Sequence, residues 1–231
     1  MEHCNLIIIP ARGGSKGLKN KNKLILGGIP LILWSIRHAK NCFSGFEIIV
    51  TTDDSDIIDL CEKNKINFLR RSEKLSSDNA MMVDVLADAL NFYERTNNKR
   101  VDNILLLQPT FPFRSENDSY KLIELIKISN FDTIISVIKV NDTHPARMYT
   151  ISESYLIAYE EKYIDLNRQD LPHVYLRNGA YYCFKSQLIR KGKLYGNKLV
   201  PFVMDAEYKV NIDDKMDFLL AQTIYNEIFK S

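Results

Sequence analysis

The sequence predicts an α/β protein built on a mostly parallel sheet with helices on both faces. Short apolar stretches alternate with longer amphipathic stretches, and polar or glycine-rich segments separate them. A chain of 231 residues is long enough for one large domain with a sizeable core. Strands that connect through helices lie parallel, and ligands of such sheets bind beyond the carboxyl ends of the strands.

Apolar stretches in the first 140 residues predict the strands. The first of them, NLIIIPA, shows no alternation with polar residues, which is typical of a strand buried on both faces. A further strand, AYYCFKS at 180–186, is expected later in the chain. The expected strands of the first part span residues 5–11, 46–52, 66–71, 101–110 and 131–140.

The stretches between the strands predict helices. Pro30 is well suited to a first helical position, and acidic residues open the segment that begins at Asp53. An apolar stripe runs from Met82 to Tyr93 at helical spacing. The expected helices span residues 30–42, 53–64, 78–96, 115–129 and 214–230.

The pattern changes between Val140 and Arg177, where short strand-like pieces and many tyrosines replace the long helices. We expect one domain over residues 1–231, with an excursion at 140–177 that resembles a hairpin arm. After it, Asn178-Gly179 predicts a turn followed by a half-buried strand.

Composition excludes several classes of protein. A net charge of +2 is too small for a nucleic-acid-binding face. The N-terminus lacks the pattern of a signal peptide, and no apolar run reaches the roughly 18 residues of a membrane span. The four cysteines show no metal-binding or disulfide spacing, which indicates reduced thiols. We therefore expect a cytoplasmic protein with no nucleic-acid or membrane partner.

The segment IPARGGSKGLKNKN, after the first strand, predicts a phosphate-binding loop. Gly13, Gly14 and Gly17 allow a tight turn whose backbone N–H groups point at an anion. The segment matches neither GxxxxGK[ST] nor GxGxxG, and an ordinary solvated turn is the alternative. The local density of cations favours phosphate binding; they are Arg12, Lys16, Lys19, Lys21 and Lys23.

Two further segments carry candidate ligand-binding residues. Gln108 ends an apolar strand, and its amide can both donate to and accept from a nucleobase edge; a rigid connecting loop is the alternative for its neighbours. Asn211 and Asp213, spaced i and i+2, can share a hard cation such as Mg²⁺. A helix N-cap is the alternative there, and it suits Asp214 better than Asp213.

These motifs, taken in order, resemble those of the acylneuraminate cytidylyltransferases, or CMP-sialic acid synthetases. The resemblance covers nearly the whole chain. Two positions depart from the family pattern: Ser72 replaces a proline, and Asn211 replaces the first aspartate of DIDxxxD. The matching motifs are ARxxSKGxxxKN at 11–22, RPxxLxxD at 71–78, QPTSPLR at 108–114, RQxLP at 168–172, NGAxY at 178–182 and DIDxxxD at 211–217.

The resemblance implies a Rossmann-like three-layer nucleotide-diphospho-sugar transferase fold with a small dimerisation arm. It also implies transfer of CMP from CTP to the anomeric hydroxyl of a nonulosonic acid of the legionaminate or N-acetylneuraminate type, with release of pyrophosphate. The implied cofactor is Mg²⁺, and the implied assembly is a homodimer whose arm, at 140–177, reaches the partner's sugar site.

The resemblance also assigns roles to particular residues. It implies catalytic roles for Arg12, Lys21 and Asp213. It implies nucleotide contacts for Ala11, Arg12, Gly13, Gly14, Ser15, Lys21, Asn22, Arg71, Ser77 and Gln108. It implies sugar contacts for Gln108, Arg168, Asn178 and Tyr182. Asp213 is expected to be the main protein ligand of Mg²⁺, with Asn211 weaker or bound through water.

Two alternative functions stay open. One is a cytidylyltransferase for another acidic keto-sugar, such as pseudaminate or 3-deoxy-manno-octulosonate, although NGAYY and RQDLP argue against a sister enzyme of this kind. The other is a nucleotide-binding protein without catalysis, favoured only by Asn211. The same motifs serve several nonulosonic acids, so they do not identify the sugar.

Overall fold

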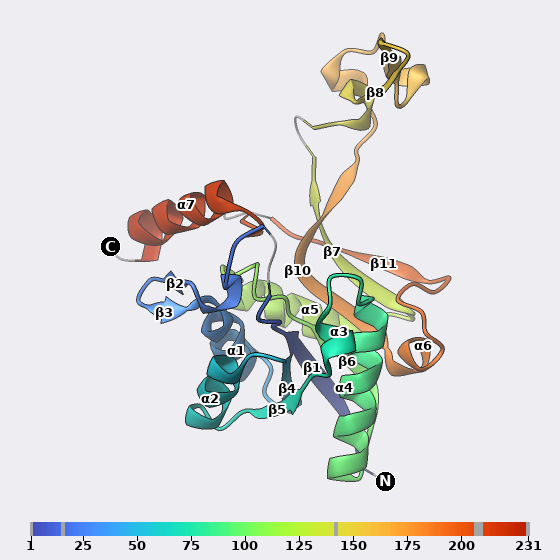
Figure 1. Cartoon of the computed structure of the whole chain (residues 1–231). Coiled ribbons are helices and arrows are strands. Elements are labelled where there is room, and N and C mark those ends of the chain that lie inside the picture. Colours follow the sequence, from blue (N-terminus) through green and yellow to red (C-terminus); the bar gives the residue numbers. More distant parts are fainter. Residues whose placement is uncertain (1, 15–16, 141–142, 206–209, 230–231) are drawn as a thin grey trace.

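A seven-stranded sheet forms the centre of the computed structural model, which describes residues 2–14, 17–140, 143–205 and 210–229 (Figure 1). The strand order is β11-β7-β10-β6-β1-β4-β5. Only β10 runs antiparallel to its neighbours, so the mostly parallel α/β sheet predicted from the sequence is confirmed. The strands are β1 (Glu2–Pro10), β4 (Phe46–Thr52), β5 (Asn67–Arg70), β6 (Lys99–Leu106), β7 (Thr133–Lys139), β10 (Tyr175–Lys185) and β11 (Leu199–Val203).

Helices cover both faces of the sheet. Successive side chains of β1 point to opposite faces, so Ile7 and Ile9 join the core on one side while Leu6 and Ile8 join the core on the other. This double burial explains why residues 6–9 of β1 are all apolar, whereas the exposed start of the strand is polar. The first face carries α1 (Leu31–Cys42), α2 (Ser55–Lys63) and α5 (Glu116–Ile128); the second carries α4 (Met82–Asn97) and α6 (Ser186–Arg190).

A third, smaller apolar cluster joins the end of the chain to its beginning. It brings α7 (Lys215–Ile224) and the π-helical turn η5 (Tyr225–Phe229) against the short hairpin of β2 (Ile25–Leu26) and β3 (Ile29–Pro30). Asp214 caps α7 by accepting hydrogen bonds from Met216 N and Asp217 N, at 2.7 and 3.0 Å. The N-cap interpretation of Asp214 is therefore confirmed, and Asp213 stays outside the helix.

The excursion forms an arm that projects from the carboxyl end of β7 (Figure 1). Its tip is a hairpin of β8 (Tyr149–Ser152) and β9 (Tyr155–Ala158), flanked by single turns η2 (Pro145–Arg147), η3 (Glu161–Tyr163) and η4 (Arg168–Asp170). Large apolar side chains lie in solvent there, with Ile151 78%, Tyr155 73% and Leu156 66% exposed.

The return strand starts earlier than the sequence indicated. Tyr175 and Arg177, which were expected in the arm, pair with Lys139 and Val137 of β7. The predicted Asn178-Gly179 turn is wrong: the register shifts between Arg177 and Tyr182, so these residues form an irregularity inside β10. Gly179 has a φ of +81°, which is why glycine suits this position.

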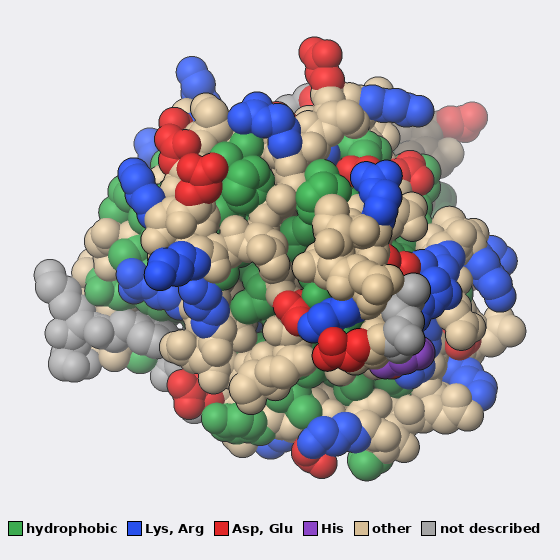
Figure 2. All heavy atoms as spheres, turned by 90° about the horizontal axis from the view of Figure 1, so that it is seen from below, with side chains coloured by type: hydrophobic (Ala, Val, Ile, Leu, Met, Phe, Trp, Pro, Cys, Tyr) green, Lys and Arg blue, Asp and Glu red, His purple; other side chains and the backbone are tan. Residues whose placement is uncertain are grey.

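The sequence missed several short elements. β11 is a largely exposed edge strand, and Pro201 inside its apolar segment LVPFV argues against a strand when only the sequence is considered. The single turn α3 (Glu73–Ser76), α6 and the β2–β3 hairpin are too short to show periodicity. None of the described helices combines the length and the apolar character needed to cross a bilayer. Seen from below, acidic and basic side chains are interspersed, in keeping with the small net charge (Figure 2).

Candidate active site

A crevice of about 400 Å³ opens beyond the carboxyl ends of β1 and β6, where the fold class places ligands. Six of the residues expected to bind nucleotide or metal line it together: Arg12, Lys21, Asn22, Arg71, Gln108 and Asp213. Gly17, Met82, Pro109 and Thr110 complete the described lining beside Pro10. Residues from both ends of the chain therefore meet in one place.

The cations of the opening loop are held by carboxylates. Arg12 Nη1 lies 2.8 Å from Asp78 Oδ1, and Lys21 Nζ lies 2.9 Å from Asp213 Oδ1. The Gly13 N–H donates to Asp53 Oδ1 at 2.9 Å. The loop is thus arranged around negative oxygen atoms, which is the arrangement that a phosphate group requires. Ser15, another predicted nucleotide contact, lies outside the described residues.

Buried and close contacts fix the shape of the loop. Asn22 is buried and donates through Nδ2 to the Arg12 carbonyl at 2.9 Å, so it holds the loop backbone. Ala11 is buried and donates its N–H to the Thr51 carbonyl. At Gly17, any Cβ would collide with the Asp213 carbonyl, so glycine permits the loop to contact the backbone at Asp213. At Gly14 a Cβ would meet open space.

Arg71 forms a buried cationic wall of the crevice. Its guanidinium donates to the Thr51 carbonyl at 2.7 Å and to Thr51 Oγ1 at 3.2 Å. Burial lowers the pKa of Arg71 to about 10, while Asp53 opposes this shift, so the side chain remains charged at neutral pH. Ser77 is exposed beyond α3, donates to the Lys74 carbonyl and does not line the crevice.

Asp213 and Asn211 lie side by side at the crevice. Asn211 Nδ2 donates to Asp213 Oδ2 at 2.7 Å, so the two carboxylate oxygens of Asp213 face Asn211 and Lys21. A Cβ placed on Gly179 would lie 3.4 Å from Asn211 Oδ1 and 3.5 Å from Gln108 Oε1. The irregularity in β10 therefore leaves room for two amide oxygens at one point.

Arg114 holds the exit of β6 and was assigned no role by the sequence reasoning. It donates to the carbonyls of Gln108, Phe111 and Ala180 at 2.8, 2.6 and 2.9 Å, and to Ser35 Oγ at 3.0 Å. Its guanidinium also lies over two aromatic rings, 5.7 Å from the Phe111 centroid and 5.6 Å from that of Tyr181. Burial lowers the pKa of Arg114 to about 10, so it stays cationic at neutral pH.

The signal for Arg114 was present in the sequence. An arginine that closes the apolar, proline-containing segment QPTFPF has five N–H donors to offer to the carbonyls that the prolines leave free.

The structure does not bring the remaining predicted sugar contacts into this crevice. Arg168 lies on the arm, beside a separate cavity of about 340 Å³. Asn178 is buried, accepts from Ser136 Oγ at 2.6 Å and donates to Met204 Sδ. Tyr182 packs on the α4 side of the sheet and stacks against Phe184, with ring planes 3° apart.

The sheet, the cationic loop and the crevice at the strand ends define a nucleotide-binding α/β protein. A family model described as Cytidylyltransferase matches residues 6–223, and the chain belongs to this family of nucleotidyltransferases.

Two relatives that differ in length support the assignment of the chain to this family. The chain is 32% identical over 225 residues to the N-acylneuraminate cytidylyltransferase of Escherichia coli O18:K1:H7, covering 95% of this chain and 51% of the relative. It is 28% identical over 224 residues to the CMP-N,N'-diacetyllegionaminic acid synthase of Legionella pneumophila, covering 95% of each. The chain thus spans about half the length of the first relative and nearly all of the second.

Solved structures agree with the fold. The structure of a CMP:2-keto-3-deoxy-manno-octonic acid synthetase complexed with CTP superposes with a TM-score of 0.70 at 15% identity, covering 98% of this chain and 99% of the other. At this identity the likeness shows the shared fold.

The Arg114 contacts predict a specific effect on stability. Arg114→Lys keeps the charge but loses the planar fork, leaving buried carbonyls without donors. We expect it to lower the free energy of unfolding by about 2 kcal/mol, measured by urea denaturation. Arg70→Lys, on the exposed end of β5, is the matched control and should change stability by less than about 0.5 kcal/mol. Equal effects of the two variants would contradict the role given to Arg114.

Proposed function

We propose that this chain transfers CMP from CTP to the anomeric hydroxyl of a nonulosonic acid of the legionaminate or N-acetylneuraminate type, releasing pyrophosphate. The observation that carries the proposal is the convergence of Arg12, Lys21, Arg71, Gln108 and Asp213 on one crevice. The family and the named activities of its relatives support the choice of the nucleotide and of the class of sugar. Because the cysteines are free thiols, we place the reaction in the cytoplasm.

In this proposal the triphosphate takes over ion pairs that the chain now makes internally. Phosphate oxygens would replace Asp78 at Arg12 and Asp213 at Lys21, at little cost in cation desolvation because both cations are already paired. The Gln108 amide would bind the nucleoside. The sugar hydroxyl oxygen would then attack the α-phosphorus, the bond to the bridging oxygen would break, and pyrophosphate would leave.

The residues present fit a single Mg²⁺ at Asp213. A carboxylate and an amide oxygen are suitable ligands for this hard cation, and substrate phosphates and water usually complete its shell. Among the described residues no cluster of three or more His, Cys, Asp or Glu side chains is arranged for a metal, so the protein would contribute few ligands. When bound, the metal neutralises charge on the α-phosphate and on the leaving pyrophosphate.

Two variants test the metal assignment. Asp213→Ala removes the only carboxylate of the pair with Asn211, and we expect turnover to fall at least about 100-fold in a pyrophosphate-release assay. Asn211→Ala should cost less, because an amide oxygen brings no charge. Since Asp213 also pairs with Lys21, Mg²⁺ titrations should show a weaker apparent affinity in both variants. A larger loss from Asn211→Ala than from Asp213→Ala would overturn the assignment.

We also propose that two copies assemble through the arm at 140–177. Arg168 lies on the arm rather than at the crevice of its own chain, so it would meet the sugar carboxylate only in a partner's crevice. The exposed apolar side chains at the tip, including Ile151 and Leu156, support burial against another chain.

A charge placed on the hairpin tests the assembly. Leu156→Glu, in β9, should give a monomer by light scattering and should lose most turnover, because a charge opposes burial of this apolar surface. Ser152→Glu, exposed at the end of β8, is the matched control for added charge. A wild-type chain that is monomeric at assay concentration would contradict the proposal.

A panel of acceptors tests the reaction itself. CTP is mixed with N-acetylneuraminate, legionaminate, pseudaminate or 3-deoxy-manno-octulosonate, and pyrophosphate release is measured. We expect turnover with a legionaminate- or neuraminate-type sugar, and no release when Arg12 and Lys21 are both replaced by alanine. Turnover only with the octulosonate, or tight CTP binding without turnover on any acceptor, would favour one of the two alternatives stated above.

A further inference from the structure

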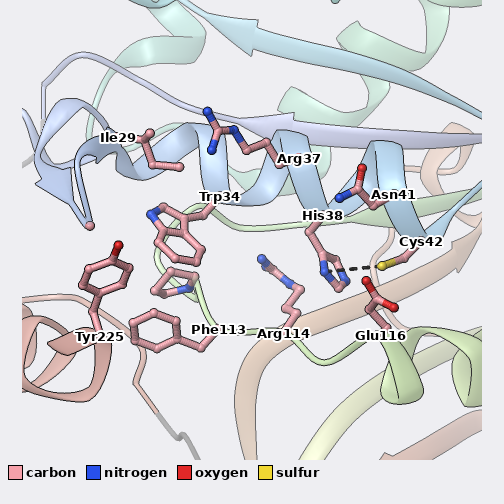
Figure 3. A pocket seen from close by; sticks show the side chains of 12 residues that line it. Ile29, Trp34, Arg37, His38, Asn41, Cys42, Phe113, Arg114, Glu116 and Tyr225 are labelled. Carbon is pink, nitrogen blue, oxygen red and sulfur yellow. Dashed lines mark hydrogen bonds between the residues drawn. The ribbon is translucent and has the colours of Figure 1, made fainter. Parts of the chain in front are cut away.

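A second cavity of about 410 Å³ lies away from the nucleotide crevice and shares none of its lining residues (Figure 3). It is a groove between α1, residues 112–116 and the turn η5, with Gly27 and Ile29 at one end. Its volume matches that of the crevice and falls in the range of small-molecule sites. Nothing in the proposed reaction uses it.

One end of the groove is aromatic. Trp34 meets Phe113 and Tyr225 edge to face, with ring centroids 5.5 and 5.8 Å away and ring planes at 82° and 83°. Gly27 has a φ of +59°, and a Cβ there would collide with the Tyr225 ring, so this glycine admits the ring. Figure 3 shows Trp34, Phe113 and Tyr225 grouped at this end, where they offer ring edges and faces to a flat apolar group.

The rest of the groove is polar, and only some of its charged side chains have partners within the protein. Arg37 and Asn41 lie one turn apart on α1, and within the described part of the chain neither side chain makes a hydrogen bond or an ion pair. His38 lies between them, and burial lowers its pKa to about 3, so the ring is neutral. The donors of Arg114 are committed to carbonyls and to Ser35. Arg37 is therefore the cation available to a ligand here, and Glu116 is the acid of the groove, at the end where Cys42 and His38 lie (Figure 3).

We infer that this groove, which we call the α1 groove, is a second binding site for a small organic anion that carries a flat ring. The ring lies against the accessible parts of Trp34 and Tyr225, which Phe113 supports from below, and the anionic group pairs with Arg37. Glu116 repels a second anionic group at the far end, which favours a ligand with one negative charge over a polyanion. The triphosphate of the crevice is thus the wrong chemistry for this site.

The α1 groove and the crevice share a connecting segment. Phe113 and Arg114 follow Gln108 at the exit of β6, and the Ile212 N–H donates to the Thr110 carbonyl at 2.8 Å. Phe113 also packs with Val210 and Ile212, directly before Asp213. A ligand that shifts Phe113 therefore changes the positions of Gln108 and Asp213 together. This coupling rests on the proposed function, whereas binding in the groove does not.

The chain contains one tryptophan, so fluorescence excited at Trp34 reports this site alone. The probe is phenylacetate, with acetate supplying the anion without the ring and benzyl alcohol supplying the ring without the anion. We expect a saturable change with phenylacetate at millimolar concentration and none with acetate, with benzyl alcohol at least about fivefold weaker. Ligand-observed NMR saturation transfer on the same samples gives a second readout.

Variants locate the binding. Arg37→Ala should weaken phenylacetate at least about tenfold, while Lys40→Ala, exposed on the same helix but outside the groove, should bind as wild type. Glu116→Gln should bind about twofold to fivefold more tightly, because it removes the repelling charge. Arg12→Ala, which alters the crevice, should leave binding unchanged. No saturable change by either readout, or an Arg37→Ala variant that binds normally, overturns the inference.

The coupling has its own readout. Phenylacetate should change KM for CTP in the wild type and not in Arg37→Ala, whose KM without phenylacetate should match that of the wild type. A chain that binds phenylacetate but shows no transferase activity would contradict the proposed function and leave the α1 groove standing. An unchanged KM in an active enzyme with the groove saturated would remove the coupling alone.

Discussion

Arg114 places a permanent positive charge inside the protein and surrounds it with neutral acceptors. Its hydrogen bonds reach three carbonyls and one hydroxyl, which belong to α1, the exit of β6 and β10. Removing any one of these elements would leave a buried cation or a buried carbonyl without a partner, and both are costly. The segment that carries Gln108 is therefore fixed against two layers of the fold at once, and the crevice on one side and the α1 groove on the other share this wall.

The charged and N–H groups of the crevice pair with carboxylates of the same chain. Arg12, Lys21 and the Gly13 N–H each contact a carboxylate that comes from a different segment. Such pairs hold long side chains in place, which reduces the entropy that a ligand would otherwise cost on binding. They also mean that an incoming phosphate exchanges one anion for another. Electrostatic preorganisation of this kind is the main resource of enzymes that transfer phosphoryl groups.

The sequence predicted the layers of the fold well because burial of both sheet faces produces long apolar runs. The same signal fails at β11, where exposure and Pro201 hide an edge strand, and at Asn178-Gly179, where a pair typical of turns lies inside a strand. The sequence also predicted that Arg12 and Asp213 belong to one site. This prediction rested on the order of the motifs and on the rule that the carboxyl ends of parallel strands meet at one edge of a sheet. The contacts of Arg114 did not follow, because they depend on which carbonyls meet in three dimensions. The position of Arg168 on the arm agrees with the excursion expected at 140–177, whereas the placement of Tyr182 on the α4 face depends on topology that spacing does not encode.

The contact between Lys21 and Asp213 joins positions 192 residues apart in the chain. The close approach of Gly17 to the Asp213 carbonyl joins the same two segments of the chain. During synthesis from the N-terminus, β1, β4 and β6 can pair long before the segment around Asp213 leaves the ribosome. Closing so large a loop costs conformational entropy, which slows its formation, and the closure must wait until Asp213 has been synthesised. The phosphate loop therefore lacks its carboxylate partner at Lys21 until Asp213 has been synthesised, and nucleotide affinity should develop only after that point.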